Sequence, residues 1–548
     1  MLIPRSLGGS SGTFLGLADT PSSYVGQALK AARVNAGATA LEFYTPTDSL
    51  FAWAADWVNV ITYGAAGVVT TTTLAATLNA GSTSATLTSA SSFAIGHGMA
   101  IPGAGAAGAE LVVELTNVVG NVVSWSGATS TLVSAGQTIH HDDTQALLDA
   151  LAMLKNVYVP VGYYNTQGGQ LNNVIQMTNI GQRIQGGMSD MRQRTQSGPV
   201  IGSVIYSRSL TKDCIQMVAN NTQVMDLTIA VDATVSTSKT AGAGLVIGDS
   251  TRSGLGPSLG PCFGAVIERV GISHHWDGMR VEYSSGCFID KLYVTAPHRY
   301  GLYGTSVEPT GGNWFQNIQC YPLGYYGGTV QAGIYLDRMD TTRWVNINCI
   351  GFPKNFWLKS AAGNINQQVF TGFTNENNTG NYGITLEKGA YNHVRCKFVG
   401  GELLASAIYV GAGVEDATFE GITLALNTAT SLIYGTRTKI IGIDSYGGIT
   451  VHSGANGTQI IGSSITTTGL TVNDGATNNV IQGNYMNTSS ISMTARGTSR
   501  IQGNIGMVDY GDSIASTPGY VGQEALSGGQ FYKAVGTSSS ADWKQITV

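Results

Sequence analysis

Aromatic and acidic side chains recur at alternate positions of short strand-like segments in the middle of this chain. In the segment 333–337, which reads GIYLD, strand alternation points Ile334 and Leu336 to the inner face. Tyr335 and Asp337 then point outward. The same alternation in neighbouring segments adds to the outward face Arg280, Glu282, Tyr303, Trp357 and Glu387. Aromatic rings stack on the apolar faces of sugars and carboxylates bond their hydroxyls, so this face suits a saccharide chain; plain packing of the rings is the alternative.

Three acids near one strand end have a spacing that suits glycosidic hydrolysis. Asp337 and Asp340 lie three positions apart, and Glu308 lies 29 positions before Asp337, about one repeat earlier. Hydrolysis uses two carboxyl groups, about 5–5.5 Å apart in retaining and about 6.5–9.5 Å apart in inverting enzymes. Neighbouring turns about 4.8 Å apart supply such distances. One carboxyl must have a raised pKa. Alternatively, these acids cap turns or pair with Arg338 and Arg343.

A second group of polar residues begins with the run HHWD at 274–277. It continues with Arg280 and Glu282, and the run HRY at 298–300 comes soon after. Proton abstraction next to a uronate carboxylate needs a base and a cation that holds the enolate. His298, Arg299 and Tyr303 could fill these roles, although a lone histidine is more often structural. His274 and His275 alternate faces, so we expect no catalytic metal, and we expect no cofactor.

The elements that position these residues are indicated by a repeat near the C-terminus. The motif Ile-Ile-Gly or Ile-Gln-Gly ends at Gly442, Gly462, Gly483 and Gly503, at intervals of 20, 21 and 20 residues. Ordering about 20 residues costs roughly 1–2 kcal/mol each, whereas a few buried Ile or Val side chains return about 1.5–3 kcal/mol each. Such a unit must stack on its copies. The residues favour strands, so we expect an all-β fold built on a parallel β-helix.

Composition restricts the classes of function. Charged residues make up 11% and the net charge is −5, which predicts no nucleic-acid partner. No apolar run reaches the roughly 18 residues of a membrane helix, so we expect no membrane insertion. The first residues lack the apolar core of a secretory signal. The six cysteines fit no zinc pattern, and we expect reduced thiols in a chain made in a cytoplasm.

Changes in composition predict five regions. They are an N-terminal connector at 1–50, a neck at 51–68, an inserted small β domain at 69–140, the β-helix with its functional face at 141–507, and a C-terminal β cap or trimerisation element at 508–548. The insertion is indicated because VNVITYGAAG at 58–67 is interrupted by Thr- and Ala-rich text and resumes as HDDTQALLDALAMLKNVYVPVGYY at 141–164. Within the resumed text we expect a helix at 146–154 and a strand at 157–160.

These two segments together resemble the start of the pectate-lyase-like domain of bacteriophage tailspikes, and the segments at 19–43 and 531–546 are similar to phage tail-fibre connectors and ends. The resemblance implies a right-handed parallel β-helix, a homotrimer, attachment to a phage tail or baseplate protein through the N-terminus, and a place in the virion. It also implies binding and endo-hydrolysis of bacterial surface polysaccharide, either O-antigen or capsule.

By the same resemblance, an acid one turn before an Asp-x-x-Asp pair is similar to the acidic cluster of endo-glycosidase tailspikes. It implies Asp337, Asp340 and Glu308 as catalytic residues. The expected substrate-binding residues are Glu282, Tyr303, Tyr335, Trp357, Arg338, Arg280 and His298. Two alternatives in the same setting stay open, a polysaccharide lyase and a non-catalytic receptor-binding fibre. A cellular pectin-degrading enzyme is a more distant alternative.

Overall fold

The computed structural model divides the chain into two units, Met1–Val58 and Asn59–Val548. The residues that the structure describes are 31–34, 41–44, 56–68, 71–167, 174–189, 202–231, 236–249, 262–305, 311–322, 330–376, 382–425, 429–466, 469–473, 475–493, 499–509, 524–527 and 530–546. In the first unit, β1 (Ala31–Val34) pairs antiparallel with β2 (Leu41–Tyr44). The functional face predicted from the sequence lies in the second unit.

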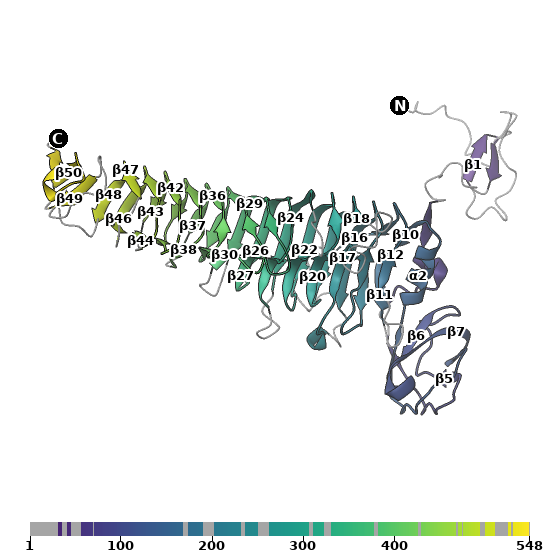
Figure 1. The fold of residues 1–548 in the computed structure, drawn as a ribbon. Coiled ribbons are helices and arrows are strands. Elements are labelled where there is room, and N and C mark those ends of the chain that lie inside the picture. Colours follow the sequence, from purple (N-terminus) through teal and green to yellow (C-terminus); the bar gives the residue numbers. More distant parts are fainter. Residues whose placement is uncertain are drawn as a thin grey trace, which may run out of the picture. The chain divides into compact units, whose positions relative to one another are not determined.

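Most of the second unit is a parallel β-helix (Figure 1). From β10 (Asn156–Val159) to β48 (Ile505–Asp509), each strand pairs in parallel with the equivalent strand one turn later, and we call one such turn a rung. The mostly β, parallel architecture predicted from the repeat is confirmed.

The C-terminal repeat marks successive rungs. Ile440 is paired with Ile460, Ile460 with Ile481, and Ile481 with Ile501. The first three of these side chains are fully buried. Each repeat therefore supplies one interior isoleucine, and it is stable because the rungs on either side cover it.

An aromatic ladder fills the interior of the middle rungs. It is carried by β24 (Asn313–Tyr321), β26 (Thr342–Ile350), β29 (Gln368–Glu376), β32 (Lys397–Val399) and β36 (Thr418–Glu420). The rings are Phe315, Trp344, Phe370, Phe398 and Phe419, all fully buried. Successive ring centroids lie 4.1, 5.2, 4.5 and 5.5 Å apart. Stacked pairs of this kind add about 0.5–1.5 kcal/mol each beyond the area they bury.

One turn position has a left-handed backbone on successive rungs, which explains the glycines of the repeat. Asn317 and Asn346 have φ 54° there, and Gly442 and Gly462 have φ 60°. L-residues rarely adopt this conformation, whereas glycine adopts it freely and asparagine tolerates it. The Asn346 amide also donates to Oδ1 of Asn317 at 2.7 Å, so the asparagines add a bond between rungs.

A single α-helix among the described residues lies at the start of the β-helix. This helix, α2 (Thr144–Ala152), lies against β10 and β12 (Ile175–Met177) and buries Leu147 and Leu151. It begins and ends two residues earlier than the predicted helix at 146–154. The end moves because Leu154 has φ 59°, which is incompatible with a helix.

Residues 72–141 form a six-stranded antiparallel sheet with its own apolar core. Its strands are β4 (Thr72–Thr73), β5 (Ser84–Thr86), β6 (Gly98–Ile101), β7 (Leu111–Val119), β8 (Val122–Trp125) and β9 (Thr138–His141). Glu110 in this region forms an ion pair of 2.6 Å with Arg208, which follows β14 (Ser203–Ser207) of the β-helix. The sheet is thus tied to the β-helix by at least one charge pair.

The last described strands form a small antiparallel sheet. They are β49 (Glu524–Ser527), β50 (Gln530–Ala534) and β51 (Trp543–Ile546). The six cysteines are buried free thiols. Within the described ranges, no helix has the length and apolar character needed to cross a membrane.

Candidate functional site

One side of the β-helix is a stack of strands that carries most of the predicted site. The strands are β20 (Asp277–Val281), β23 (Tyr300–Gly304), β25 (Ala332–Leu336), β27 (Lys354–Lys359) and β30 (Tyr382–Glu387). Their register places Tyr303 beside Tyr335 and Tyr335 beside Trp357. With Tyr300, these three residues form a cluster that we call the aromatic face.

The rings of the aromatic face pack closely on one another. The Tyr335 centroid lies 4.4 Å from that of Tyr300, 5.4 Å from that of Tyr303 and 4.7 Å from that of Trp357. Tyr300 and Tyr335 are only 6% and 7% exposed. The Lys354 ammonium lies 3.8 Å from the Trp357 centroid and covers one face of the indole. Lys354 therefore leaves at most one face of the Trp357 indole open to a ligand.

Asp337 lies directly after β25, beside these rings, and is 7% exposed. The Tyr303 hydroxyl donates to its Oδ2 at 2.6 Å. Burial raises the pKa of Asp337 above its usual value, while hydrogen bonds from Tyr303 and Thr305 and the charge of Arg299 oppose the rise. A carboxyl group with a raised pKa in this position has the property required of a general acid.

Three buried polar atoms along this stack have no hydrogen-bond partner among the described residues. They are Oδ1 of Asp337, Nε1 of Trp357 and Oγ1 of Thr385. Trp357 and Thr385 are register partners on adjacent rungs. Buried polar atoms are nearly always bonded, because leaving one unpaired costs about 1–3 kcal/mol. Asp337, Trp357 and Thr385 lie on successive rungs of one stack, so these atoms are candidates for hydrogen bonds to a ligand.

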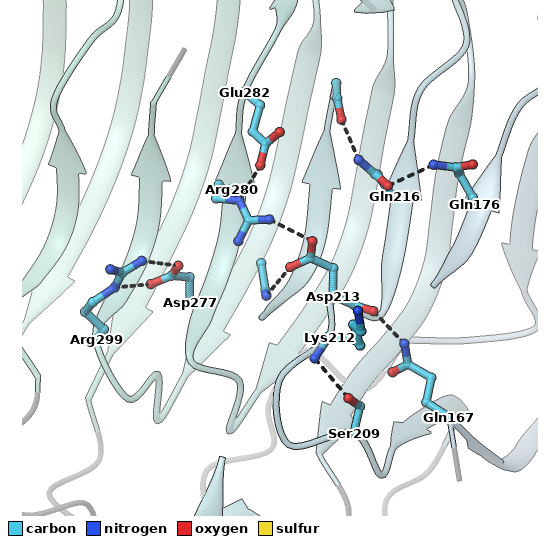
Figure 2. A network of polar contacts seen from close by, with 12 residues as sticks. Gln167, Gln176, Ser209, Lys212, Asp213, Gln216, Asp277, Arg280, Glu282 and Arg299 are labelled. Carbon is cyan, nitrogen blue, oxygen red and sulfur yellow. Dashed lines mark hydrogen bonds and ion pairs between the residues drawn. The ribbon is translucent and has the colours of Figure 1, made fainter. Parts of the chain in front are cut away.

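Arg280, two rungs before Asp337, forms ion pairs with two acids (Figure 2). Its Nη2 lies 2.7 Å from Oδ2 of Asp213 and its Nε lies 2.7 Å from Oε1 of Glu282. Asp213 also accepts the backbone N–H of Ala243 at 2.7 Å. Glu282 is 7% exposed. The carboxylate of Glu282 is therefore oriented by a charged donor that is itself fixed from the other side.

A second ion pair connects this network to the aromatic face. Arg299 donates from Nε and Nη2 to the two carboxylate oxygens of Asp277, at 2.9 and 2.6 Å, as Figure 2 shows. Burial raises the pKa of Asp277 even though Arg299 opposes the rise. The Arg299 guanidinium also lies 4.6 Å from the ring centroid of Tyr300 and 5.0 Å from that of Tyr303. Arg299 thus brings a positive charge close to the tyrosine that bonds Asp337.

The other end of the face carries one more acid between two lysines. Glu387 Oε1 lies 3.2 Å from Nζ of Lys354, and Oε2 lies 3.9 Å from Nζ of Lys359. Lys359 is the register partner of Glu387. Asp337 therefore has a paired carboxylate on each side of it along the stack, Glu282 and Glu387.

The structure brings most of the predicted site together on this stack. The residues concerned are Arg280, Glu282, Tyr303, Tyr335, Asp337 and Trp357. His298, in the loop before β23, is 4% exposed, and burial lowers its pKa. Its ring centroid lies 6.0 Å from that of Trp276.

Two of the other predicted residues, Asp340 and Arg338, make contacts with residues outside this group. The carboxylate of Asp340 accepts the backbone N–H of Thr341 at 2.9 Å, in the turn after β25. The side chain of Arg338 lies against Gly363, so closely that a Cβ at this glycine would clash with it. Glu308 lies outside the described residues.

Several residues of the site were not among those predicted to form it. They are Asp213, Lys354 and Thr385, whereas Asp277, Arg299 and Tyr300 lie in the runs that the sequence indicated only for the elimination alternative. Asp277 is the register partner of Tyr300 one rung later, and Arg299 directly precedes Tyr300, so the repeat could have indicated that Asp277 and Arg299 are close. Asp213 and Arg280 are separated by 67 residues with long connections between them, and no regular interval relates them.

Comparisons with known proteins establish no family for this chain. No family model matches the chain, and no curated protein matches its sequence. Similar solved structures include the A-module of a mannuronan C-5 epimerase from Azotobacter vinelandii, with 14% identity, 66% of this chain and 95% of that chain covered, and a TM-score of 0.36.

Two further structures are the catalytic unit of an α-1,3-glucanase from Streptomyces thermodiastaticus and the Dettilon tailspike protein. The glucanase is 11% identical in sequence, with a TM-score of 0.33, and the alignment covers 73% of this chain and 77% of the glucanase chain. The tailspike is 10% identical in sequence, with a TM-score of 0.31, and the alignment covers 72% of this chain and 73% of the tailspike chain. At these values the similarities say nothing about the reaction of this chain, whose family they do not establish.

Proposed function

We propose that this chain binds a polysaccharide along the stack β20–β30 and cleaves it by hydrolysis, with Asp337 as the general acid. The observation that carries the proposal is the state of Asp337. It is a buried carboxyl group with a raised pKa on an outward-facing strand stack, and its Oδ1 has no partner among the described residues. A protonated carboxyl group there can give its proton to a glycosidic oxygen.

The second carboxylate in this proposal is Glu282. Val281 is paired with Gly304, and Gly304 is paired with Leu336. The residue after Val281 therefore lies two rungs before the residue after Leu336. Glu282 and Asp337 are those residues, and two rungs separate their backbones by about 10 Å. Inverting hydrolysis needs carboxyl groups about 6.5–9.5 Å apart, which leaves room for a water molecule, so the proposal requires the two side chains to lean slightly toward each other.

In such a reaction, Asp337 protonates the leaving oxygen as the glycosidic bond breaks. Glu282, oriented by Arg280, removes a proton from the water that attacks the anomeric carbon on the opposite side. Both carboxyl groups then exchange their protons with solvent. The product has the opposite anomeric configuration to the substrate, which NMR of the first product formed would show.

The remaining site residues hold the sugar. The rings of Tyr335 and Trp357 offer apolar contact, and the Trp357 N–H and Thr385 hydroxyl offer hydrogen bonds. Arg338 and His298 are part of the proposal only as secondary contacts, because they lie beside the stack. Asp340 and Glu308 remain proposed acids whose contribution is tested by substitution.

The biological setting in this proposal is that of a phage tailspike. It rests on the resemblance carried by the segments 58–67 and 141–164. The chain would form a homotrimer, attach to the tail or baseplate through its N-terminal residues, and cleave O-antigen or capsular polysaccharide at the bacterial surface. Light scattering of the purified chain measures the trimer directly.

Elimination is the second candidate reaction, and one observation favours it. Burial lowers the pKa of His298, so its imidazole is neutral at pH 7, next to Arg299 in the sequence. A neutral imidazole can remove a proton and an arginine can hold an enolate. Burial raises the pKa of Tyr303, which makes a tyrosinate base less accessible.

Incubation of the purified chain with a panel of bacterial O-antigen and capsular polysaccharides tests the proposal. Shorter chains with new reducing ends and no unsaturated sugar mean hydrolysis, as we expect. Shorter chains with the ultraviolet absorbance of an unsaturated uronate mean elimination. A polymer that binds but keeps its length identifies a non-catalytic fibre and refutes the enzymatic proposal.

A further inference from the structure

A hollow of about 430 Å³ lies on a different strand stack from the aromatic face. Arg343 on β26, Val369 on β29 and Lys397 on β32 line it, together with Arg395 and Gln367 from the turns before these strands. β26 pairs with β24 and β29, whereas β25, which leads to Asp337, pairs with β23 and β27. We call these five residues the arginine hollow.

The hollow exists because a short side chain lies between two long ones. Arg343 is the register partner of Val369, and Val369 is the register partner of Lys397. Rungs are about 4.8 Å apart, so the two cationic side chains leave a gap of about two rungs over the valine. The gap is built into the register of three adjacent strands.

Two of the cations in the hollow form no ion pair with the described residues. Lys397 is paired with Glu420 at 2.8 Å. Asp416, which also lines the hollow, is held by Arg437 at 2.7 Å. No such pair exists for Arg343 or Arg395 within the described part of the chain, and both side chains are exposed. The hollow therefore presents the Arg343 guanidinium and that of Arg395, and the charge of Arg395 is attracted by Asp416, which Arg437 already pairs.

Exposed aromatic rings continue the hollow along the same stack. Trp314 is the register partner of Arg343, and Phe288 is the register partner of Trp314; both rings are 37% exposed. The Arg343 guanidinium lies 5.5 Å from the Trp314 ring centroid. Ring surface next to unpaired guanidinium groups suits a ligand that is both apolar on one face and negatively charged.

We propose that the arginine hollow binds acidic saccharide units, in which a carboxylate is held by Arg343 and Arg395 and the sugar ring contacts Trp314. It is a second binding site on the β-helix, and it rests on the proposed function in that the polymer cleaved near Asp337 is the one held here. The polymer is therefore acidic. Carboxylates suit the fork of a guanidinium, which donates two parallel hydrogen bonds.

The test measures binding in the full chain carrying Asp337→Asn, so that cleavage does not consume the ligand. The probes are polygalacturonate, hyaluronate and polysialate, with dextran as the neutral polymer and inorganic phosphate as the free anion. We expect at least one acidic polymer to bind at low salt and more weakly at high salt. Arg343→Gln with Arg395→Gln should weaken that binding about tenfold or more. Lys155→Gln, which removes an exposed charge after α2, is the matched control and should leave binding unchanged.

The outcomes separate this inference from the proposed function. Binding of no acidic polymer, binding that the double variant retains, or equal binding of dextran overturns the inference. Phosphate that competes as tightly as the polymer also overturns it, because the hollow then takes a free anion. A change in oligomeric state of the double variant, with polymer binding unaltered, assigns this stack to contact between copies and overturns it as well. Cleavage near Asp337 is measured separately with the native chain.

Discussion

Replacement of Asp337 by asparagine removes the proposed proton donor with little change of shape. The asparagine Oδ1 can still accept the hydrogen bond that Tyr303 donates to Oδ2 of Asp337 at 2.6 Å. The uncharged amide also suits a site whose burial already raises the pKa of the acid. The variant should therefore fold normally. A positioned general acid contributes about 10²–10⁴-fold to a rate, or roughly 3–5 kcal/mol of activation free energy. We expect kcat to fall by that factor.

The assay is the initial rate of reducing-end release from a polysaccharide that the native chain shortens. Asp444→Asn is the matched control, because Asp444 is an exposed acid at the start of β40 (Asp444–Ser445), outside the proposed site. We expect this control to keep most of its activity and both variants to melt at the native temperature. A folded Asp337→Asn variant with more than about a tenth of the native kcat would refute the role of Asp337.

Three further changes have expected outcomes. Tyr303→Phe removes a hydrogen bond that lowers the pKa of Asp337, so Asp337 should stay protonated to higher pH. The alkaline limb of the pH profile of kcat should therefore shift to higher pH. An unshifted limb would show that Tyr303 does not influence the pKa of the catalytic acid. Trp357→Ala should weaken oligosaccharide binding about fivefold, a modest loss because the indole face is already covered, whereas Tyr446→Ala, on an exposed ring elsewhere, should have no effect. Burial lowers the pKa of His393 to about 4 from 6.5, so the unfolded chain binds a proton in that window that the folded chain does not. Stability is therefore full above pH 6.5 and falls by up to about 3 kcal/mol as pH drops toward 4, and His393→Gln should flatten this dependence in thermal unfolding.

The β-helix was predictable because its repeat is local. The interval that separates Ile440 from Ile460 in the sequence is also the register of the strands. A unit of about 20 residues is too small to fold alone, so stacking is the one solution that buries its isoleucines. The conformation of the turn, in which Gly442 has φ 60°, also follows from the position of glycine in the motif.

The start of the helix α2 shows where local signals are insufficient. Asp142 and Asp143 precede this helix, and acidic side chains at a helix N-terminus commonly stabilise its positive end. Asp142 does accept the Thr144 N–H at 3.0 Å, but Asp143 accepts the N–H of Ala66 at 2.7 Å instead. Burial raises the pKa of Asp143. Ala66 and Asp143 are 77 residues apart because the strands of the antiparallel sheet lie between them in the sequence, so no short-range pattern relates the two.

The direction in which the side chains of the candidate site point was predictable from the sequence, but their burial was not. Strand alternation pointed Tyr335 and Asp337 outward, on the same stack as Trp357. It did not indicate that both Tyr335 and Asp337 would be 7% exposed. The burial arises because rings on rungs about 4.8 Å apart cover their neighbours. The ion pair between Arg280 and Asp213 was missed because their strands lie two rungs apart and these two rungs differ in length.

A crystal structure of the Asp337→Asn chain with a bound oligosaccharide of its own substrate tests the central claim most directly. We expect the sugar to lie along β23, β25 and β27, with a glycosidic oxygen within about 3 Å of the side chain at position 337. A ligand bound only on another stack, or on this stack with every glycosidic oxygen beyond reach of that side chain, would contradict the account.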